Sequence, residues 1–191
     1  MIHSRVLRNR LVFAAVFAAL IAVSNFFQIP TPLGVPIVLK NMFVVLSGAV
    51  LGSFYGGLAV LILIGAGIIG IPVFVIPGGI GVFNTPLGGY IIGYFAGSLC
   101  AGLICGLPKI SEKKLRPIPV IRICIGVISG FAIILVCGSL YIKFLKSMTL
   151  SSAFLVGTVP FIIGDLIKTA LGIALALPLR PIAARYINNE G

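Results

Sequence analysis

Long runs of apolar residues follow one another along almost the whole chain, separated only by short segments rich in glycine, proline or basic residues. A helix needs about 20 such residues to cross the hydrocarbon core of a bilayer. Charged residues make up only 9% of the chain, against about 25% in a typical soluble domain. The sequence therefore predicts a single all-α integral membrane domain over residues 1–191.

The apolar runs predict six transmembrane helices, over residues 9–27, 37–53, 55–72, 86–107, 119–142 and 153–177. Basic residues precede the first run, as they do in a signal peptide, but no small-x-small cleavage site ends it. We therefore interpret it as an uncleaved span. Six crossings place both termini on the same side of a multi-pass membrane protein.

The net charge of +11 is compatible with nucleic-acid binding, but the positions of the charges indicate membrane topology instead. Ten of the fourteen Lys and Arg residues fall near the termini or around the fourth connection: Arg5, Arg8, Arg10, Lys109, Lys113, Lys114, Arg116, Arg122, Arg180 and Arg185. Lys143 and Lys146 fall on the opposite side. Because Lys and Arg accumulate in cytoplasmic loops, we expect both termini in the cytoplasm and no nucleic-acid partner.

Asp165 and Lys168 lie in the middle of the sixth apolar run, where each ionised group costs roughly 2.5–3.5 kcal/mol on insertion scales. Their spacing puts them on neighbouring positions of one helix face. Pro160 predicts a kink just before the pair, because proline removes a helical hydrogen bond. The pair is either an ion pair that fixes helix register or an anchor for a polar ligand. We favour the ligand, since Ser or Asn would fix register at lower cost.

Three other polar residues are candidate ligand contacts. Lys40, in the second run, either extends its ammonium group to the membrane interface or lines an outward-facing cavity. Asn84 and Tyr90 flank the start of the fourth run, and Tyr90 has the alternative role of an interfacial anchor. They would reach a ligand near Asp165 if the fourth and sixth spans are neighbours.

The first run contains two adjacent rows of small residues with four-residue spacing: Ala14, Ala18 and Ala22, and Ala15 and Ala19. Such spacing lets membrane helices approach closely. It is equally compatible with packing inside the bundle and with docking of another membrane subunit.

Enzymatic chemistry finds little support in the sequence. The only histidine, His3, is near the terminus, and the four cysteines have no metal-ligand spacing. Walker A, H-E-x-x-H and Ser/His/Asp patterns do not occur. The segment 65–70 matches GxGxxG, but Ile71-Pro72 follows where the helix of a dinucleotide site should begin, so we interpret its glycines as helix-packing residues. We expect neither a catalytic residue nor a metal or other cofactor, and without a nucleotide site the chain cannot energise transport itself.

Several segments together resemble one family. They are the alanine-rich first span, the segments 32–39, 70–74 and 86–90, and, most specifically, the segment 160–168 with its Asp165 and Lys168. This pattern is similar to that of the BioY family, the biotin-specific S components of energy-coupling factor (ECF) transporters. The two most specific segments, 86–90 and 160–168, occur in the family's order.

The resemblance implies an S-component-like bundle of six helices in the bacterial cytoplasmic membrane that captures biotin from outside. It implies a transmembrane coupling subunit and two cytoplasmic ATPases as partners. Asn84, Tyr90, Asp165 and Lys168 would surround the biotin head, and the alanine rows would face the coupling subunit. The chain departs from the family at Lys40, where Gln is common, and around Pro86 and Leu87. On charge alone, Lys40 would meet the valerate carboxylate.

Three alternatives remain at the level of the sequence. The chain could be an S component for another vitamin, a membrane assembly subunit without a ligand, or a facilitator that works without ATPases. Binding of a vitamin panel separates the first two from biotin capture, and uptake into proteoliposomes separates the third.

Overall fold

The computed structural model describes residues 2–29, 37–74, 79–113 and 117–187, and the statements below concern these residues. The first external connection, which includes Thr31–Gly34, lies outside them. Seven α-helices and three 3-10 helices follow in the order α1 (Ile2–Ser24), α2 (Lys40–Leu51), α3 (Ser53–Ile68), η1 (Ile80–Asn84), α4 (Leu87–Cys105), η2 (Ile110–Lys113), α5 (Pro117–Lys146), α6 (Leu150–Gly157), η3 (Val159–Phe161) and α7 (Ile162–Ile187). The short strands β1 (Gln28–Ile29) and β2 (Ile37–Val38) pair antiparallel, with Gln28 opposite Val38.

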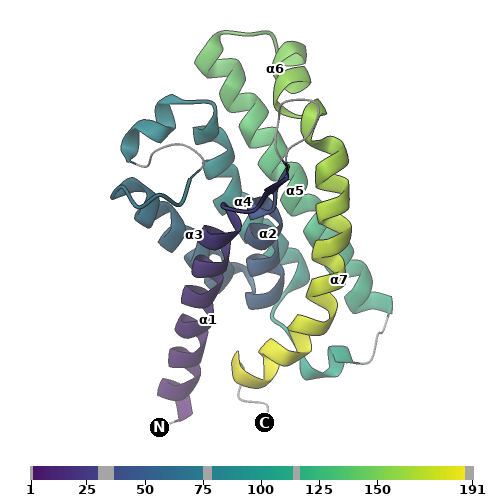
Figure 1. The fold of residues 1–191 in the computed structure, drawn as a ribbon. Helices are drawn as coiled ribbons and strands as arrows, with labels where there is room; N and C mark the ends of the chain where they lie inside the picture. Colours follow the sequence, from purple (N-terminus) through teal and green to yellow (C-terminus); the bar gives the residue numbers. More distant parts are fainter. Residues whose placement is uncertain (1, 30–36, 75–78, 114–116, 188–191) are drawn as a thin grey trace.

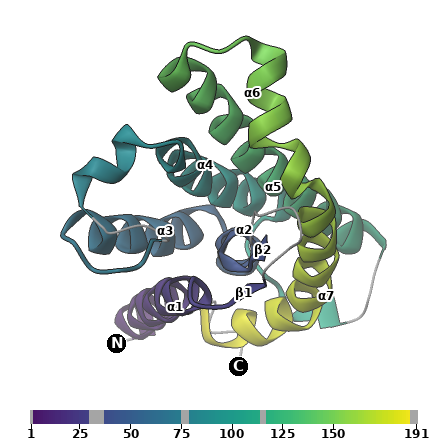
Figure 2. The same ribbon diagram turned by 45° about the horizontal axis from the view of Figure 1, so that its top comes forward.

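Helix α2 forms the centre of the bundle, and α1, α3, α4, α5 and α7 surround it (Figure 2). Residues 44–51 of α2 are all buried. At Ser47 the hydroxyl donates to Val44 O and lies 3.1 Å from the Ser98 hydroxyl of α4. A continuous apolar surface with satisfied hydroxyls explains how so short a helix is held in the interior.

Small residues allow α4 and α5 to pack closely along their length. Gly89, Gly93 and Gly97 recur every four residues on α4, and a Cβ atom at any of them would collide with α5. At Gly97 the nearest atom is the backbone oxygen of Gly130, so the two backbones meet at a pair of glycines. This is the small-xxx-small packing typical of membrane helices.

The outer faces of the long helices carry large apolar side chains. On α5 and α7 the exposed ones include Ile118, Ile121, Ile125, Ile128, Ile163, Leu166, Ile167 and Leu171. Extensive exposed apolar surface marks contact with a membrane. Four helical stretches, Arg5–Ser24, Leu87–Cys105, Pro117–Lys146 and Leu150–Ile187, are long and apolar enough to cross one. The chain is therefore a multi-pass membrane protein.

Both ends of the described chain lie at the same end of the bundle (Figure 1). Asn9 Nδ2 donates to Tyr186 O at 3.0 Å, and Arg10 Nε donates to Ile187 O at 2.9 Å. Helix η2 lies at this end too, since Glu112 contacts α7. The C-terminal end of α5, with Lys143 and Lys146, lies at the other end.

The predicted spans correspond to the observed helices with three differences. Helices α4 and α5 match the runs 86–107 and 119–142 closely, and α1 covers most of the run 9–27 but begins at Ile2. Helices α2 and α3 have only 12 and 16 residues, shorter than a full crossing. The β1–β2 pair was not expected. The sixth run is interrupted rather than kinked and extends beyond residue 177.

The interruption of the sixth run lies at Thr158, whose backbone φ and ψ are −122° and −51°. Helix α6 ends at Gly157, and Pro160 lies within η3, where its missing N–H is tolerated. Helix α7 then continues to Ile187 although it contains Pro178 and Pro181. It changes direction in its C-terminal part, as proline-containing helices do (Figure 1).

Candidate functional site

The predicted pair Asp165–Lys168 is buried on the inner face of α7. The side chains are 4% and 3% exposed, and Lys168 Nζ forms an ion pair with Oδ1 of Asp165. Lys168 Nζ also donates to Val38 O, the end of β2, at 3.3 Å. The ammonium group thus connects α7 to the segment that leads into α2.

The Asp165 carboxylate retains unused capacity to accept hydrogen bonds. Lys168 Nζ is the partner of Oδ1, and among the described residues Oδ2 has no hydrogen-bond donor. A buried carboxylate normally accepts several hydrogen bonds, and leaving it without them is costly. The arrangement is therefore suited to a ligand that brings N–H donors.

Lys40 begins α2 and is only 2% exposed, which contradicts the interfacial position and agrees with the cavity-lining one. Its Nζ donates to Val73 O at 2.6 Å and lies 5.3 Å from the centre of the Phe74 ring. Phe74 in turn packs where Gly67 of α3 lacks a side chain. Lys40 thus links the start of α2 to the segment after α3.

Tyr90 on α4 combines a structural hydrogen bond with an aromatic wall. Its hydroxyl donates to Gly157 O, the last carbonyl of α6, at 2.5 Å. Its ring packs against Gly138 of α5 and lies 6.0 Å from the Phe161 ring, tilted at 61°. The hydroxyl therefore stabilises the interruption before α7, while the ring remains available to a ligand.

A cavity of about 100 Å³ is bordered by Lys40, Tyr90 and Lys168. Its walls come from β2, α2, α4, α5, α7 and the connections: Val38, Lys40, Asn41, Phe74, Leu87, Tyr90, Tyr94, Leu135, Phe161 and Lys168. Aromatic and aliphatic side chains surround a few polar ones, which is the usual composition of a small-molecule site. The fourth and sixth predicted spans do meet here, as the sequence argument required.

Asp165 is not itself among the cavity-lining residues, but its ion-pair partner Lys168 is. Asn84 lies apart from the cavity. It ends η1, its side chain is exposed, and it is not among the cavity-lining residues. Its role in binding stays a prediction. Tyr94 and Asn41 are wall residues that sequence reasoning missed. Tyr94 follows Tyr90 by four residues, a spacing that places both on one helix face and could have identified it.

The alanine rows of α1 divide between interior and surface. Ala14 and Ala18 are buried, with 0% and 5% exposure, and Ala22 is half-buried. Ala15 and Ala19 are exposed. The first row therefore packs inside the bundle, as one of the two interpretations held, and only the second row remains available for another protein.

A second buried charge cluster lies far from the cavity, and sequence reasoning read its cation only as a topology signal. Arg180 is 1% exposed and forms an ion pair with Glu112 of η2, with an Nε–Oε2 distance of 2.7 Å. Its remaining N–H groups donate to four carbonyls, those of Ala49, Cys105, Gly106 and Leu107. The guanidinium group has five N–H donors in a fixed arrangement, which suits a position where several helix ends meet.

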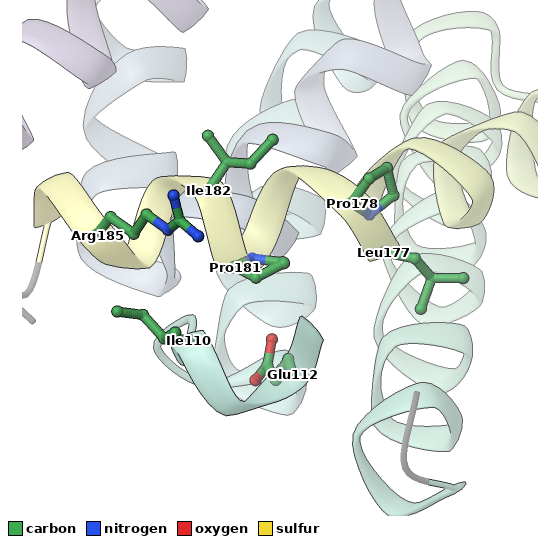
Figure 3. Close-up of a pocket in the computed structure, with 7 residues that line it drawn as sticks. All are labelled: Ile110, Glu112, Leu177, Pro178, Pro181, Ile182 and Arg185. Carbon is green, nitrogen blue, oxygen red and sulfur yellow. The ribbon is translucent and has the colours of Figure 1, made fainter. Parts of the chain in front are cut away.

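A larger hollow of about 550 Å³ lies beside this cluster, between η2 and the C-terminal part of α7 (Figure 3). It is lined by Ile110, Glu112, Leu177, Pro178, Pro181, Ile182 and Arg185. Its lining is mainly apolar, and Glu112 is already bound by Arg180. Converging polar groups that orient a ligand are found instead in the smaller cavity at Lys168, which is the candidate site.

Comparisons with known proteins agree with this assignment. The BioY family model matches residues 2–185. The biotin transporter BioY of Thermotoga maritima is 36% identical over 176 residues, covering 91% of this chain and 97% of the relative. That of Rhodobacter capsulatus is 36% identical over 168 residues, covering 81% and 84%. The crystal structure of the S component for biotin from an ECF-type ABC transporter superposes with a TM-score of 0.73 at 28% identity, covering 90% of each chain.

Proposed function

Because the chain belongs to the BioY family, we propose that it takes up biotin as the substrate-capture subunit, the S component, of an energy-coupling factor transporter. The observation that carries the proposal is the buried Asp165 carboxylate. Its Oδ2 has no hydrogen-bond donor among the described residues, and its ion-pair partner, Lys168, lines a cavity with aromatic walls.

The chemistry of the cavity fits the biotin head. A ureido ring offers two N–H donors, from which the Asp165 carboxylate would accept hydrogen bonds, and a carbonyl oxygen, to which Lys168 Nζ would donate. Hydrogen bonds to charged groups contribute roughly 1.5–3 kcal/mol each. The thiophane ring and the chain would lie against Tyr90, Tyr94 and Phe161. These residues bind and orient the vitamin, and none acts on a covalent bond.

Binding requires the cavity to widen. Its volume of about 100 Å³ is below the roughly 300–1,000 Å³ of typical ligand sites. Two of its walls, Val38 and Phe74, belong to connections rather than to long helices. Connections are the parts of a bundle most able to move, so we expect these walls to shift when the ligand enters.

The proposed topology has six crossings with both termini in the cytoplasm of the bacterial cell. It is supported by the basic residues near the termini and η2, which lie at one end, while Lys143 and Lys146 lie at the other. Helices α2 and α3 would be the two short crossings, surrounded by longer helices. Biotin would then enter from the outer end, where Lys40 and Lys168 lie.

The proposed partners are a transmembrane coupling subunit and two cytoplasmic ATPases. The exposed pair Ala15 and Ala19 on α1 supports a helix-to-helix contact of the small-xxx-small kind. Arg5, Arg8 and Arg10 precede this row and would lie near the cytoplasmic interface.

Saturation binding to the purified protein tests the proposed substrate. We expect saturable binding of labelled biotin in nanodiscs, displaced by unlabelled biotin but not by riboflavin or thiamine. Displacement by another vitamin would identify an S component of different specificity. Absence of saturable binding of any vitamin would identify an assembly subunit and overturn the proposal.

A further inference from the structure

The charges around the candidate cavity do not balance. Two buried ammonium groups, Lys40 and Lys168, line it, and one buried carboxylate, Asp165, is paired with Lys168. The partners of Lys40 are neutral: the Val73 carbonyl and the face of the Phe74 ring. Among the described residues, the formal charges at the cavity therefore leave Lys40 without an acidic partner.

No other acidic side chain of the described chain supplies the missing charge. The sequence has three acidic residues. Glu112 is bound by Arg180 near the ends of α4 and α7, and Glu190 lies outside the described residues. No carboxylate of the described chain lies within 4.0 Å of Lys40 Nζ. A buried ammonium group without a counter-ion is costly unless a ligand provides one.

We propose that Lys40 makes this site selective for ligands that carry one negative charge, by forming an ion pair with an acid group at the end of the ligand opposite to its polar head. This inference rests on the proposed function and specifies which part of the ligand sets its affinity. A carboxylate replaces the Val73 carbonyl as the acceptor of Lys40, because charge-assisted hydrogen bonds are about twice as strong as neutral ones.

The position of Lys40 supports a contact with the ligand that is separate from the contact of Lys168. Lys40 comes from the start of α2, whereas Lys168 and Asp165 come from α7, and both lysines face the same cavity. A single ligand in this cavity can therefore contact both lysines through different groups. Since Lys40 is only 2% exposed, bulk water and salt do not supply its counter-ion.

Two variants and two ligands test the inference. Lys40→Gln keeps a hydrogen-bond donor and much of the length but removes the charge, and Lys40→Arg keeps the charge. Biotin and its primary amide, biotinamide, share the rings and differ in charge. Binding of both is measured for all three proteins in nanodiscs, and thermal unfolding without ligand verifies that each variant is folded.

The wild type is expected to bind biotin at least tenfold more tightly than biotinamide, a difference of about 1.4 kcal/mol. Lys40→Gln should bring this ratio close to one by weakening biotin alone, and Lys40→Arg should retain the preference. Equal affinities in the wild type would overturn the inference and leave biotin capture intact. So would an equal loss for both ligands in Lys40→Gln, which would make Lys40 only a support for Val73. Failure of the wild type to bind either compound would instead reject the proposed function.

Discussion

Asp165 and Lys168 are expensive to bury, and their surroundings show why a register device is an insufficient explanation. An ion pair that only fixed α7 would satisfy its own hydrogen bonds, yet Oδ2 of Asp165 lacks a hydrogen-bond donor in the described chain. Lys168, in contrast, has a second partner in Val38 O. The pair thus retains unused acceptors beside a cavity, which suits the recognition of N–H groups.

Replacing Asp165 by Asn should weaken biotin binding by roughly 1–3 kcal/mol for each hydrogen bond lost or made neutral. The side chain keeps its shape, but Lys168 loses its counter-ion. Saturation binding measures the loss. Thermal unfolding of the ligand-free variant is the control, because a purely structural pair would lower stability and leave the affinity of the folded protein unchanged.

Tyr90→Phe separates the two roles of this residue. The variant loses the hydrogen bond to Gly157 O, which should reduce the free energy of unfolding by about 0.5–1.5 kcal/mol. The ring, its contact with Phe161 and the cavity wall are preserved, so biotin affinity should fall much less than in Tyr90→Ala. If both variants lose affinity equally, the hydroxyl group contacts the ligand directly.

At the scale of helices, the sequence predicts the bounds of a helix best where a single long apolar run also packs as one straight helix. Helices α1, α4 and α5 meet that condition. The sixth run does not, because it is interrupted by the 3-10 helix that contains Pro160. Tyr90 of α4 stabilises this interruption through Gly157 O, and a contact between residues so far apart in sequence cannot be predicted from the run itself. Helix α7 passes Pro178 and Pro181 because Arg180, between them, is held by η2 and by four carbonyls. Judged from its prolines alone, the helix is expected to end before Pro178.

The Arg180 cluster should be the main support of the end of the bundle at which α1 begins and α7 ends. Arg180→Met leaves Glu112 and several carbonyls without their partner, and removing one member of a buried ion pair costs about 3–5 kcal/mol. Chemical unfolding in detergent measures this loss. Arg185→Met, at an exposed position near the end of α7, is the matched control and should change stability by less than about 0.5 kcal/mol.

The cluster should act on stability and leave ligand recognition nearly unaffected. Arg180 follows Lys168 by twelve residues on α7, about 18 Å along a helix axis. Biotin affinity of the folded Arg180→Met protein should therefore equal that of the wild type within threefold. A selective loss of affinity without a loss of stability would show that the Arg180 cluster is coupled to the cavity.

For the whole molecule, the structure divides the two alanine rows of α1 between two tasks that the sequence could not separate. Periodicity places both rows on adjacent faces, but only the packed bundle shows which face is turned inward. The candidate site shows the same limit. Asp165, Lys168, Lys40 and Tyr90 could be found from their chemistry, whereas the contribution of Tyr94 and the exposure of Asn84 depend on how α4 and η1 are placed.

Larger side chains on the exposed row should block assembly without changing capture of the vitamin. Ala15→Leu with Ala19→Leu should abolish co-purification with the coupling subunit and leave biotin affinity unchanged. Ala14→Leu with Ala18→Leu is the matched comparison and should destabilise the bundle, because overpacking a buried position costs about 1–3 kcal/mol. Normal co-purification of the first double variant would assign docking to another face.

The central claim, that the buried pair of α7 recognises the polar head of biotin, is tested most directly by an experimental structure of the protein saturated with biotin. We expect the ureido nitrogens within hydrogen-bond distance, about 2.7–3.2 Å, of the Asp165 oxygens, and the ureido oxygen in contact with Lys168 Nζ. Biotin bound at the hollow between η2 and α7, or in the cavity with its ureido ring away from Asp165, would contradict the claim.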